Sequence, residues 1–158
     1  MAETKFHMRR KEREVTDPQK MQEIIKKSTI CRLGLVNNGE AYIVPVNFGY
    51  MNNSLYFHSA LEGRKVDLLN KNKRVTFEIE GDYSIDKAGK TGCDVKYQSI
   101  FGKGTADFIE DREEKIRGLK AIMRQCTGSE YAFSLDKLST VLVVRIDIDS
   151  MTCKQAGF

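Results

Sequence analysis

The stretch of sequence that decides the fold is Tyr56-Phe57-His58-Ser59-Ala60-Leu61-Glu62-Gly63-Arg64-Lys65. Its aromatic start predicts a β-strand, since aromatic residues are enriched in strands. Ser59 and Glu62 then match a capping box, with Ser59 as the N-cap and Glu62 as the third helical residue. We therefore expect a strand that passes directly into a helix ending at about Leu69.

This junction also carries two adjacent cations, Arg64 and Lys65. The first N–H groups of a helix attract an anion through direct hydrogen bonds and through the helix dipole, and the two side chains add a guanidinium fork and a point charge. The pattern predicts a phosphate site. Solvated cations on a surface helix are the alternative, and the local sequence leaves both interpretations open.

Working outward from the junction, the sequence predicts β-strands on both sides of it. They are expected at 31–36, 41–48, 55–58, 75–79, 95–109 and 142–148. Asn37-Asn38-Gly39 supplies the positive-φ residues of a tight hairpin turn, and Gly102 and Gly104 permit a bend in the long strand. Helices are expected at about 18–28 and from Asp111 to just before Gly128, and a mobile loop at 81–93.

Six strands in hairpin order with a few short helices predict a mainly β fold, an antiparallel barrel, because β–α alternation is missing between the early strands. Residues 16–158 form the expected single domain, preceded by a flexible basic arm at 1–15. Pro45 places its strand at an edge or bulge, because proline cannot donate to a ladder. The free backbone groups near Val46 and Asn47 could then contact a planar heterocycle, or the strand is simply an edge.

Composition excludes several classes of function. The chain has 158 residues, 30% of them charged, and a net charge of +4 with acidic residues interspersed, so no phosphate-tracking stripe for nucleic acid emerges. No apolar run approaches the ~18 residues of a membrane span. The first residues lack the apolar core of a secretion signal, which favours the cytosol. The four cysteines have no metal-ligand spacing, and hydrolase motifs are missing.

The chain resembles the FMN-binding split barrels related to pyridoxamine phosphate oxidase, and within them the branch of nitroimidazole-resistance proteins. The resemblance covers about Asp17 to Ile148. It rests, in order, on Cys31-Arg32-Leu33-Gly34, Val44-Pro45-Val46-Asn47-Phe48, Tyr56-Phe57-His58-Ser59-Ala60, Gly63-Arg64-Lys65, Asn72-Lys73-Arg74-Val75, and Cys93 followed by Tyr97-Gln98-Ser99-Ile100-Phe101-Gly102.

The resemblance implies a six-stranded antiparallel split β-barrel that forms a homodimer with FMN at the subunit interface. Ser59, Gly63, Arg64 and Lys65 would hold the FMN phosphate, while Val46 and Asn47 would border the flavin ring. The remaining implied cofactor contacts are His58, Tyr97 and Ser99. His58 is also the candidate catalytic residue, although a lone histidine is more often a packed or exposed residue.

The chain departs from the true oxidases at its end. It closes with Thr152-Cys153-Lys154-Gln155-Ala156-Gly157-Phe158 and lacks their arginine-bearing tail, which argues against oxidation of vitamin B6. We therefore expect an FMN-dependent oxidoreductase that takes electrons from NAD(P)H and reduces a small electron-poor acceptor such as a nitroaromatic or nitroimidazole-like compound. The flavin would supply the redox chemistry. The alternative is a non-catalytic flavin- or haem-binding split barrel, in which His58 could ligate iron.

Overall fold

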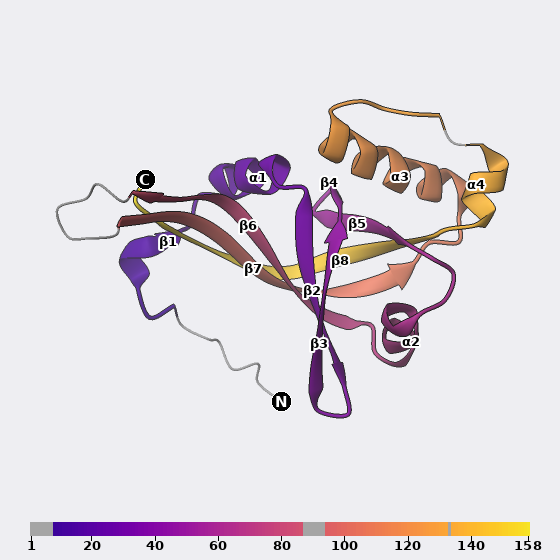
Figure 1. Ribbon diagram of the computed structural model, residues 1–158, viewed down its shortest axis with the longest axis horizontal. Coiled ribbons are helices and arrows are strands. Elements are labelled where there is room, and N and C mark those ends of the chain that lie inside the picture. Colours follow the sequence, from indigo (N-terminus) through magenta and orange to yellow (C-terminus); the bar gives the residue numbers. More distant parts are fainter. Residues whose placement is uncertain (1–7, 87–93, 133) are drawn as a thin grey trace.

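The computed structural model describes residues 8–86, 94–132 and 134–158. One antiparallel sheet of eight strands dominates it, with hydrogen-bonded order β3-β2-β6-β7-β8-β5-β4 and with β1 paired to β8 (Figure 1). The strands are β1 (Glu14–Val15), β2 (Ile30–Asn37), β3 (Glu40–Asn47), β4 (Gly49–Met51), β5 (Ser54–Ser59), β6 (Arg74–Asp86), β7 (Asp94–Phe108) and β8 (Leu142–Ala156). Pairing does not close this sheet, although Cα atoms of β3 and β5 come within 8 Å of each other.

The expected strands are all present, and short turn sequences account for the two hairpins. The β2–β3 hairpin turns at Asn38 and Gly39, whose φ angles are 52° and 85°. The β4–β5 hairpin turns at Asn52 and Asn53, which also have positive φ. Pro45 lies in β3, an end strand of the sheet, as predicted. The register between β7 and β8 shifts between Lys103 and Gly104, which confirms the expected irregularity at this glycine pair.

Four helices and a short 3₁₀ turn, η1 (Lys11–Arg13), accompany the sheet in the described part of the chain. The helices are α1 (Pro18–Lys27), α2 (Arg64–Lys71), α3 (Arg112–Thr127) and α4 (Leu135–Ser139). Asp17 caps α1 by accepting a hydrogen bond from Gln19 N at 2.9 Å. Asp111 caps α3 in the same way through Glu114 N at 2.8 Å, and Gly128 ends α3 in the left-handed region. None of these helices combines the length and the apolar composition that a bilayer crossing requires.

The apolar core is divided between the two faces of β5. Leu55 and Phe57 belong to the larger cluster, together with Leu68 and Leu69 of α2. Tyr56 belongs to a second cluster that α3 covers. Figure 1 shows the same division, with α3 and α4 on one side of β5 and β8 and α2 on the other. Alternation along β5 therefore decides which helix each of its side chains meets.

The backbone of α3 lies directly against β4. A Cβ atom at Gly49 would overlap the backbone of Ala121 and Ile122, so only glycine permits this approach. Gln125 on α3 also accepts a hydrogen bond from Tyr50 N at 2.9 Å and donates to the carbonyls of Ile25 and Ser28. The helix is thus fixed to both β4 and the end of α1.

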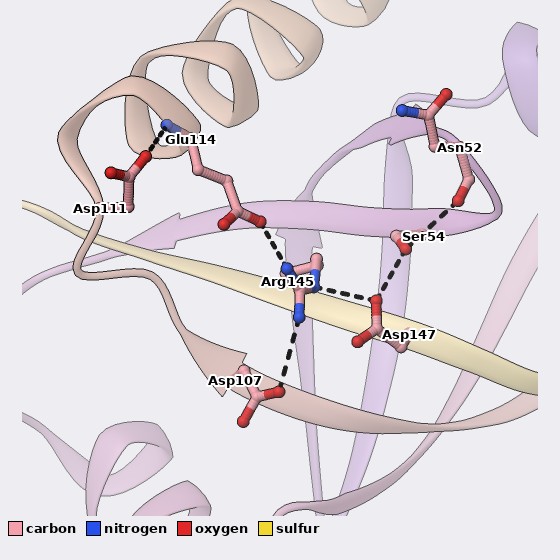
Figure 2. Close-up of polar contacts among 7 residues, drawn as sticks. All are labelled: Asn52, Ser54, Asp107, Asp111, Glu114, Arg145 and Asp147. Carbon is pink, nitrogen blue, oxygen red and sulfur yellow. Dashed lines mark hydrogen bonds and ion pairs between the residues drawn. The ribbon is translucent and has the colours of Figure 1, made fainter.

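A half-buried arginine on β8, Arg145, links the N-terminal end of α3 to the sheet (Figure 2). Arg145 on β8 contacts Glu114 on α3 at 2.5 Å, Asp147 at 2.9 Å and Asp107 on β7 at 3.7 Å. Asp147 in turn accepts a hydrogen bond from the Ser54 hydroxyl at 2.9 Å. These residues, called here the Arg145 cluster, join α3 to three strands.

Several expectations from sequence are wrong. The helix begins at Arg64 with Gly63 as its N-cap, not at Ser59, because Ser59 continues β5 by pairing with Leu142. The expected loop at 81–93 is strand over 81–86, since β6 continues past a bulge to pair with β7; residues 87–93 lie outside the described residues. Eight strands replace the six expected, because β1 and β4 are two and three residues long.

Residues 11–15, which the sequence analysis assigns to the basic arm, are part of this structure. They form η1 and β1, and β1 pairs with β8 through Glu14 and Val15. Val15 is buried in the larger core cluster. This segment is therefore attached to the sheet.

Candidate functional site

The N-terminus of α2 presents backbone donors without partners inside the helix. The first helical hydrogen bond runs from Asp67 N to the Gly63 carbonyl at 3.0 Å, which leaves the amides of residues 64–66 outside the helical ladder. No side chain caps this end. Gly63 has a φ of 128°, a region that favours glycine, and nothing lies within 4 Å of where its Cβ would be. The turn therefore leaves open space beside the helix end.

Arg64 and Lys65 stand on aromatic rings at this end of α2. The Arg64 guanidinium lies 4.7 Å from the ring centre of Tyr42, and Lys65 Nζ lies 5.4 Å from that of Phe57. Within the described ranges, neither forms an ion pair with a carboxylate. Partial burial lowers the pKa of Lys65 below its ordinary value, because desolvation disfavours the ammonium form. Among the described residues, the two positive charges at the start of α2 therefore have no ion-pair partner.

Ser59 and His58 leave β5 toward different helices. Because side chains alternate along a strand, Ser59 shares a face with Phe57, on the α2 side, whereas His58 shares a face with Tyr56, on the α3 side. Ser59 is half-buried and does not cap α2. His58 is exposed and lines a pocket with side chains of α3 and with Lys137, Thr140 and Val141. The adjacent residues therefore lie in two compartments separated by β5.

Val46 and Asn47 lie at the end of edge strand β3. Val46 is 9% exposed and packs in the larger core cluster. Asn47 is exposed, and its side-chain amide donates to the Thr29 carbonyl at 3.0 Å. Both side chains therefore have partners within the chain. The unpaired backbone edge of β3 is the part of this strand that a ligand could contact.

Tyr97 and Ser99 lie far from α2 along the sheet. They occupy the start of β7, whereas α2 lies near the other end of β7, where Lys73 Nζ sits 4.1 Å from the Phe108 ring centre. The segment from Tyr97 to Phe108 spans roughly 35 Å at the usual rise per residue, and Figure 1 shows the two ends on opposite sides of the molecule. One chain therefore does not bring Tyr97 and Ser99 to Arg64 and Lys65.

Tyr97 has its own cationic surroundings. Its hydroxyl accepts a hydrogen bond from Arg13 at 3.1 Å, and Lys154 Nζ lies 5.9 Å from its ring centre. The Arg13 hydrogen bond, with a smaller contribution from Lys154, lowers the pKa of Tyr97. Arg13, which lies in the stretch that the sequence predicts to be a flexible basic arm, therefore contacts Tyr97.

The structure brings together Ser59, Gly63, Arg64 and Lys65, and it adds Tyr42 and Phe57, which sequence reasoning missed as ring platforms for the two cations. Tyr42 lies far from Arg64 along the chain. The two residues meet because β3 pairs with β2 and α2 packs against β2. Among the described residues, no group of three or more histidine, cysteine, aspartate or glutamate side chains could hold a metal ion.

The fold is that of a mainly antiparallel β protein, and the junction of β5 and α2 is its candidate anion site. The sequence profile of the pyridoxamine 5'-phosphate oxidase family matches residues 17–155. The chain therefore belongs to this family. No curated protein sequence matches it at a significant level.

Solved structures agree with this assignment. A protein from Bacteroides thetaiotaomicron, provisionally described as a 5-nitroimidazole antibiotic resistance protein, is 32% identical with a TM-score of 0.82, over 90% of this chain and 86% of that one. A flavocytochrome from Azotobacter vinelandii has 16% identity and a TM-score of 0.78, over 96% and 73% of the two chains. An FAD-binding protein from Mesorhizobium loti has 17% identity and a TM-score of 0.69, over 92% and 98%. The last two show similarity of fold alone.

Proposed function

We propose that this protein is a cytoplasmic FMN-dependent oxidoreductase that uses electrons from NAD(P)H to reduce a small electron-poor acceptor of the nitroaromatic or nitroimidazole type. When bound, FMN would supply the electron transfer. The residues of this chain would anchor the phosphate, orient the ring and leave one face of it open. The relative from Bacteroides thetaiotaomicron, with its provisional link to 5-nitroimidazole resistance, supports this class of acceptor.

The observation that carries the proposal is the pair of cations at the start of α2, which form no ion pair with any described residue. Arg64 and Lys65 rest on Tyr42 and Phe57 beside backbone amides that have no helical partner. A phosphate monoester fits this donor set, because it can accept hydrogen bonds from amides, guanidinium and ammonium at once. Ser59 does not cap α2, so its hydroxyl would be available to the phosphate on the same side of β5.

A second copy of the chain would complete the site. Tyr97 and Ser99 are remote from α2 within one chain, so they would contact FMN held by the other subunit. The outer face of β3, β2, β6 and β7 supports this arrangement, because Ile43 is 67% exposed and Phe101 49% exposed there. They border a hollow of about 310 Å³. Exposed apolar patches of this kind are typical of interfaces.

The cytoplasmic location is supported by the thiols. Cys31 and Cys153 are buried and unpaired, and Cys126 is half-buried and unpaired. Burial raises the pKa of Cys31 to about 12, so this thiol stays protonated and unreactive. Reduced cysteines of this kind suit a reducing compartment.

The decisive experiment is a flavin titration followed by a visible spectrum. Wild-type protein should bind FMN, and the bound flavin should bleach on addition of NADH or NADPH and recover when a nitroaromatic acceptor is added. Replacing both cations, Arg64→Ala with Lys65→Ala, should weaken FMN binding by about 3 kcal/mol, the scale of losing charged hydrogen bonds. Unchanged FMN affinity in this double variant would contradict the phosphate assignment.

The same spectra test the alternative of a non-catalytic module. FMN that binds but resists reduction by both nicotinamides would indicate a flavin carrier. A Soret band after addition of haem, lost in His58→Ala, would indicate a haem protein, since His58 is the exposed histidine of the described residues that opens into a pocket.

A further inference from the structure

The outer face of β7 and β8 carries a second group of polar side chains, at the end of the sheet away from α2. Tyr97 and Ser99 are two residues apart in β7, so their side chains share a face, and Lys154 of β8 pairs directly opposite Ser99. All three are half-buried, whereas their neighbours Gln98 and Cys153 point into the molecule and are buried. Directly opposed side chains have Cβ atoms about 5 Å apart. The three side chains therefore lie side by side on the outer face.

Arg13 reaches this group from η1. Its guanidinium donates a hydrogen bond to the Tyr97 hydroxyl at 3.1 Å, and Lys154 Nζ lies 5.9 Å from the centre of the same ring. The position of Arg13 is fixed, because β1 follows it directly, pairs with β8 and buries Val15. Figure 1 shows η1 and β1 at the end of the sheet opposite α2. Two cations thus converge on one phenol.

These two cations have no ion-pair partner in the part of the chain that the structure describes. Glu14 lies opposite Lys154 in the pairing of β1 with β8, but it is exposed and forms no ion pair with Lys154. Glu80, on the neighbouring strand β6, is paired with Arg32 at 3.2 Å. The positive charges of Arg13 and Lys154 are therefore available to a ligand.

The hydroxyl groups add to this donor set. The oxygen of Tyr97 accepts from Arg13, so the hydroxyl hydrogen of Tyr97 can be donated to a ligand. The Ser99 hydroxyl has no hydrogen-bond partner among residues 8–86, 94–132 and 134–158. A phosphate group has three terminal oxygens and can accept from a guanidinium, an ammonium and hydroxyls together. The lowered pKa of Tyr97, caused mainly by the Arg13 hydrogen bond, agrees with a place that favours negative charge.

We propose that Arg13, Lys154 and Ser99 bind a terminal phosphate at a second anion site, and that this phosphate is the 2'-phosphate by which NADPH differs from NADH. The second clause rests on the function proposed above, which requires a nicotinamide donor and does not distinguish the two. In the proposed dimer, Tyr97 and Ser99 contact FMN of the other subunit. The cations beside them would then select the donor of electrons to that flavin.

The surface next to the cations suits a nucleotide better than a free phosphate. Tyr83 pairs opposite Tyr97 across β6 and β7 and is 57% exposed. The next pair on this face, Ile85 and Val95, is 44% and 36% exposed. An aromatic ring with apolar neighbours is a surface on which a base can stack. The adenosine that carries the 2'-phosphate would thus find a place for its base beside the place for its charge.

The test is calorimetric titration of the intact protein with NADP⁺ and with NAD⁺, which differ only in this phosphate. The protein is saturated with FMN, so that the phosphate site at α2 is filled, and the oxidised nucleotides prevent electron transfer. Wild type should bind NADP⁺ about tenfold more tightly than NAD⁺, the effect of one charged hydrogen bond. Inorganic phosphate is titrated separately as the other source of the same chemistry and should bind more weakly than NADP⁺.

Variants identify the residues that hold the phosphate. Arg13→Gln and Lys154→Gln should each weaken NADP⁺ binding about tenfold and leave NAD⁺ and FMN affinity unchanged, which also shows that the variants fold. Lys11→Gln is the matched control, because Lys11 is an exposed cation of the same turn η1. Its NADP⁺ affinity should stay close to that of wild type. Equal losses in Lys11→Gln and Arg13→Gln would indicate diffuse attraction and overturn the site.

The remaining outcomes separate this inference from the proposed function. Equal affinities for NADP⁺ and NAD⁺ in wild type, or no binding of either, would overturn the inference, while bleaching of bound FMN by both reduced nucleotides would keep the oxidoreductase. Inorganic phosphate that binds as tightly as NADP⁺ would overturn the choice of NADPH as ligand. A preference for NADP⁺ without bleaching of FMN by NADPH would support the phosphate site and overturn the proposed oxidoreductase.

Discussion

Two groups of cations in this molecule have opposite surroundings. Arg145 is 28% exposed in its side chain and faces three carboxylates, from α3, β7 and β8. Arg64 and Lys65 face aromatic rings and free amides, with no carboxylate partner among the described residues. A charge neutralised within the fold serves the fold, whereas a charge left without a partner is available to a ligand.

The largest expected effect is on stability, at Arg145. Arg145→Met leaves Glu114, Asp147 and Asp107 near one another without their shared cation, and the free energy of unfolding should fall by about 2 to 3 kcal/mol. Chemical denaturation measures this change in the free energy of unfolding. Arg124→Met is the matched control, because Arg124 pairs with Glu130 on an exposed surface and its loss should cost under about 1 kcal/mol. Equal losses in both variants would contradict the structural role of the Arg145 cluster.

Lys65 should show the reverse pattern. Lys65→Met keeps an apolar stem on Phe57 but removes the charge, so FMN affinity should fall by about 1.5 to 2 kcal/mol. Stability should not fall. The lowered pKa of Lys65 means that its charged form costs folding free energy at every pH below the ordinary lysine value, a cost that fades as pH rises toward that value. At neutral pH the variant should therefore gain up to about 0.5 kcal/mol. A clear loss of stability would show that Lys65 supports the fold.

The smallest effect concerns Tyr97, at the other end of the sheet. Arg13→Gln removes the hydrogen bond that lowers the pKa of Tyr97, so its ionisation should move to higher pH, which ultraviolet titration of tyrosinate measures. Because a lowered acid pKa stabilises the fold only where the phenolate forms, wild type and variant should differ in stability at alkaline pH and agree at pH 7. Lys154→Met should shift the titration less. An unmoved titration in Arg13→Gln would exclude this contact in solution.

Local sequence signals predicted most of the fold. Asp17-Pro18, Asp111 with Gly128, and the Asn37-Asn38-Gly39 turn act within a few residues, and the structure confirms each. The capping box at Ser59 failed, because pairing with Leu142, far along the chain, satisfies that backbone in a strand. The prediction of a loop from Gly81 is wrong over 81–86 for the same reason. This part of β6 pairs with β7, which follows it in the sequence only after a glycine-rich stretch.

The candidate site divides in the same way. Gly63, Arg64 and Lys65 are consecutive, so their chemistry was visible in the sequence. Tyr42, Arg13 and the Arg145 cluster were not, because each contact joins elements that only the sheet topology brings together. Ordinary tyrosines and arginines carry no mark that distinguishes these positions.

The close approach of α3 to Gly49 has a consequence for measurement in solution. Because the helix backbone rests on β4 without an intervening side chain, the amide protons of its buried face can meet solvent only when the helix lifts as a unit. Deuterium uptake by Leu119 and Ile122 should therefore report on the whole α3 layer.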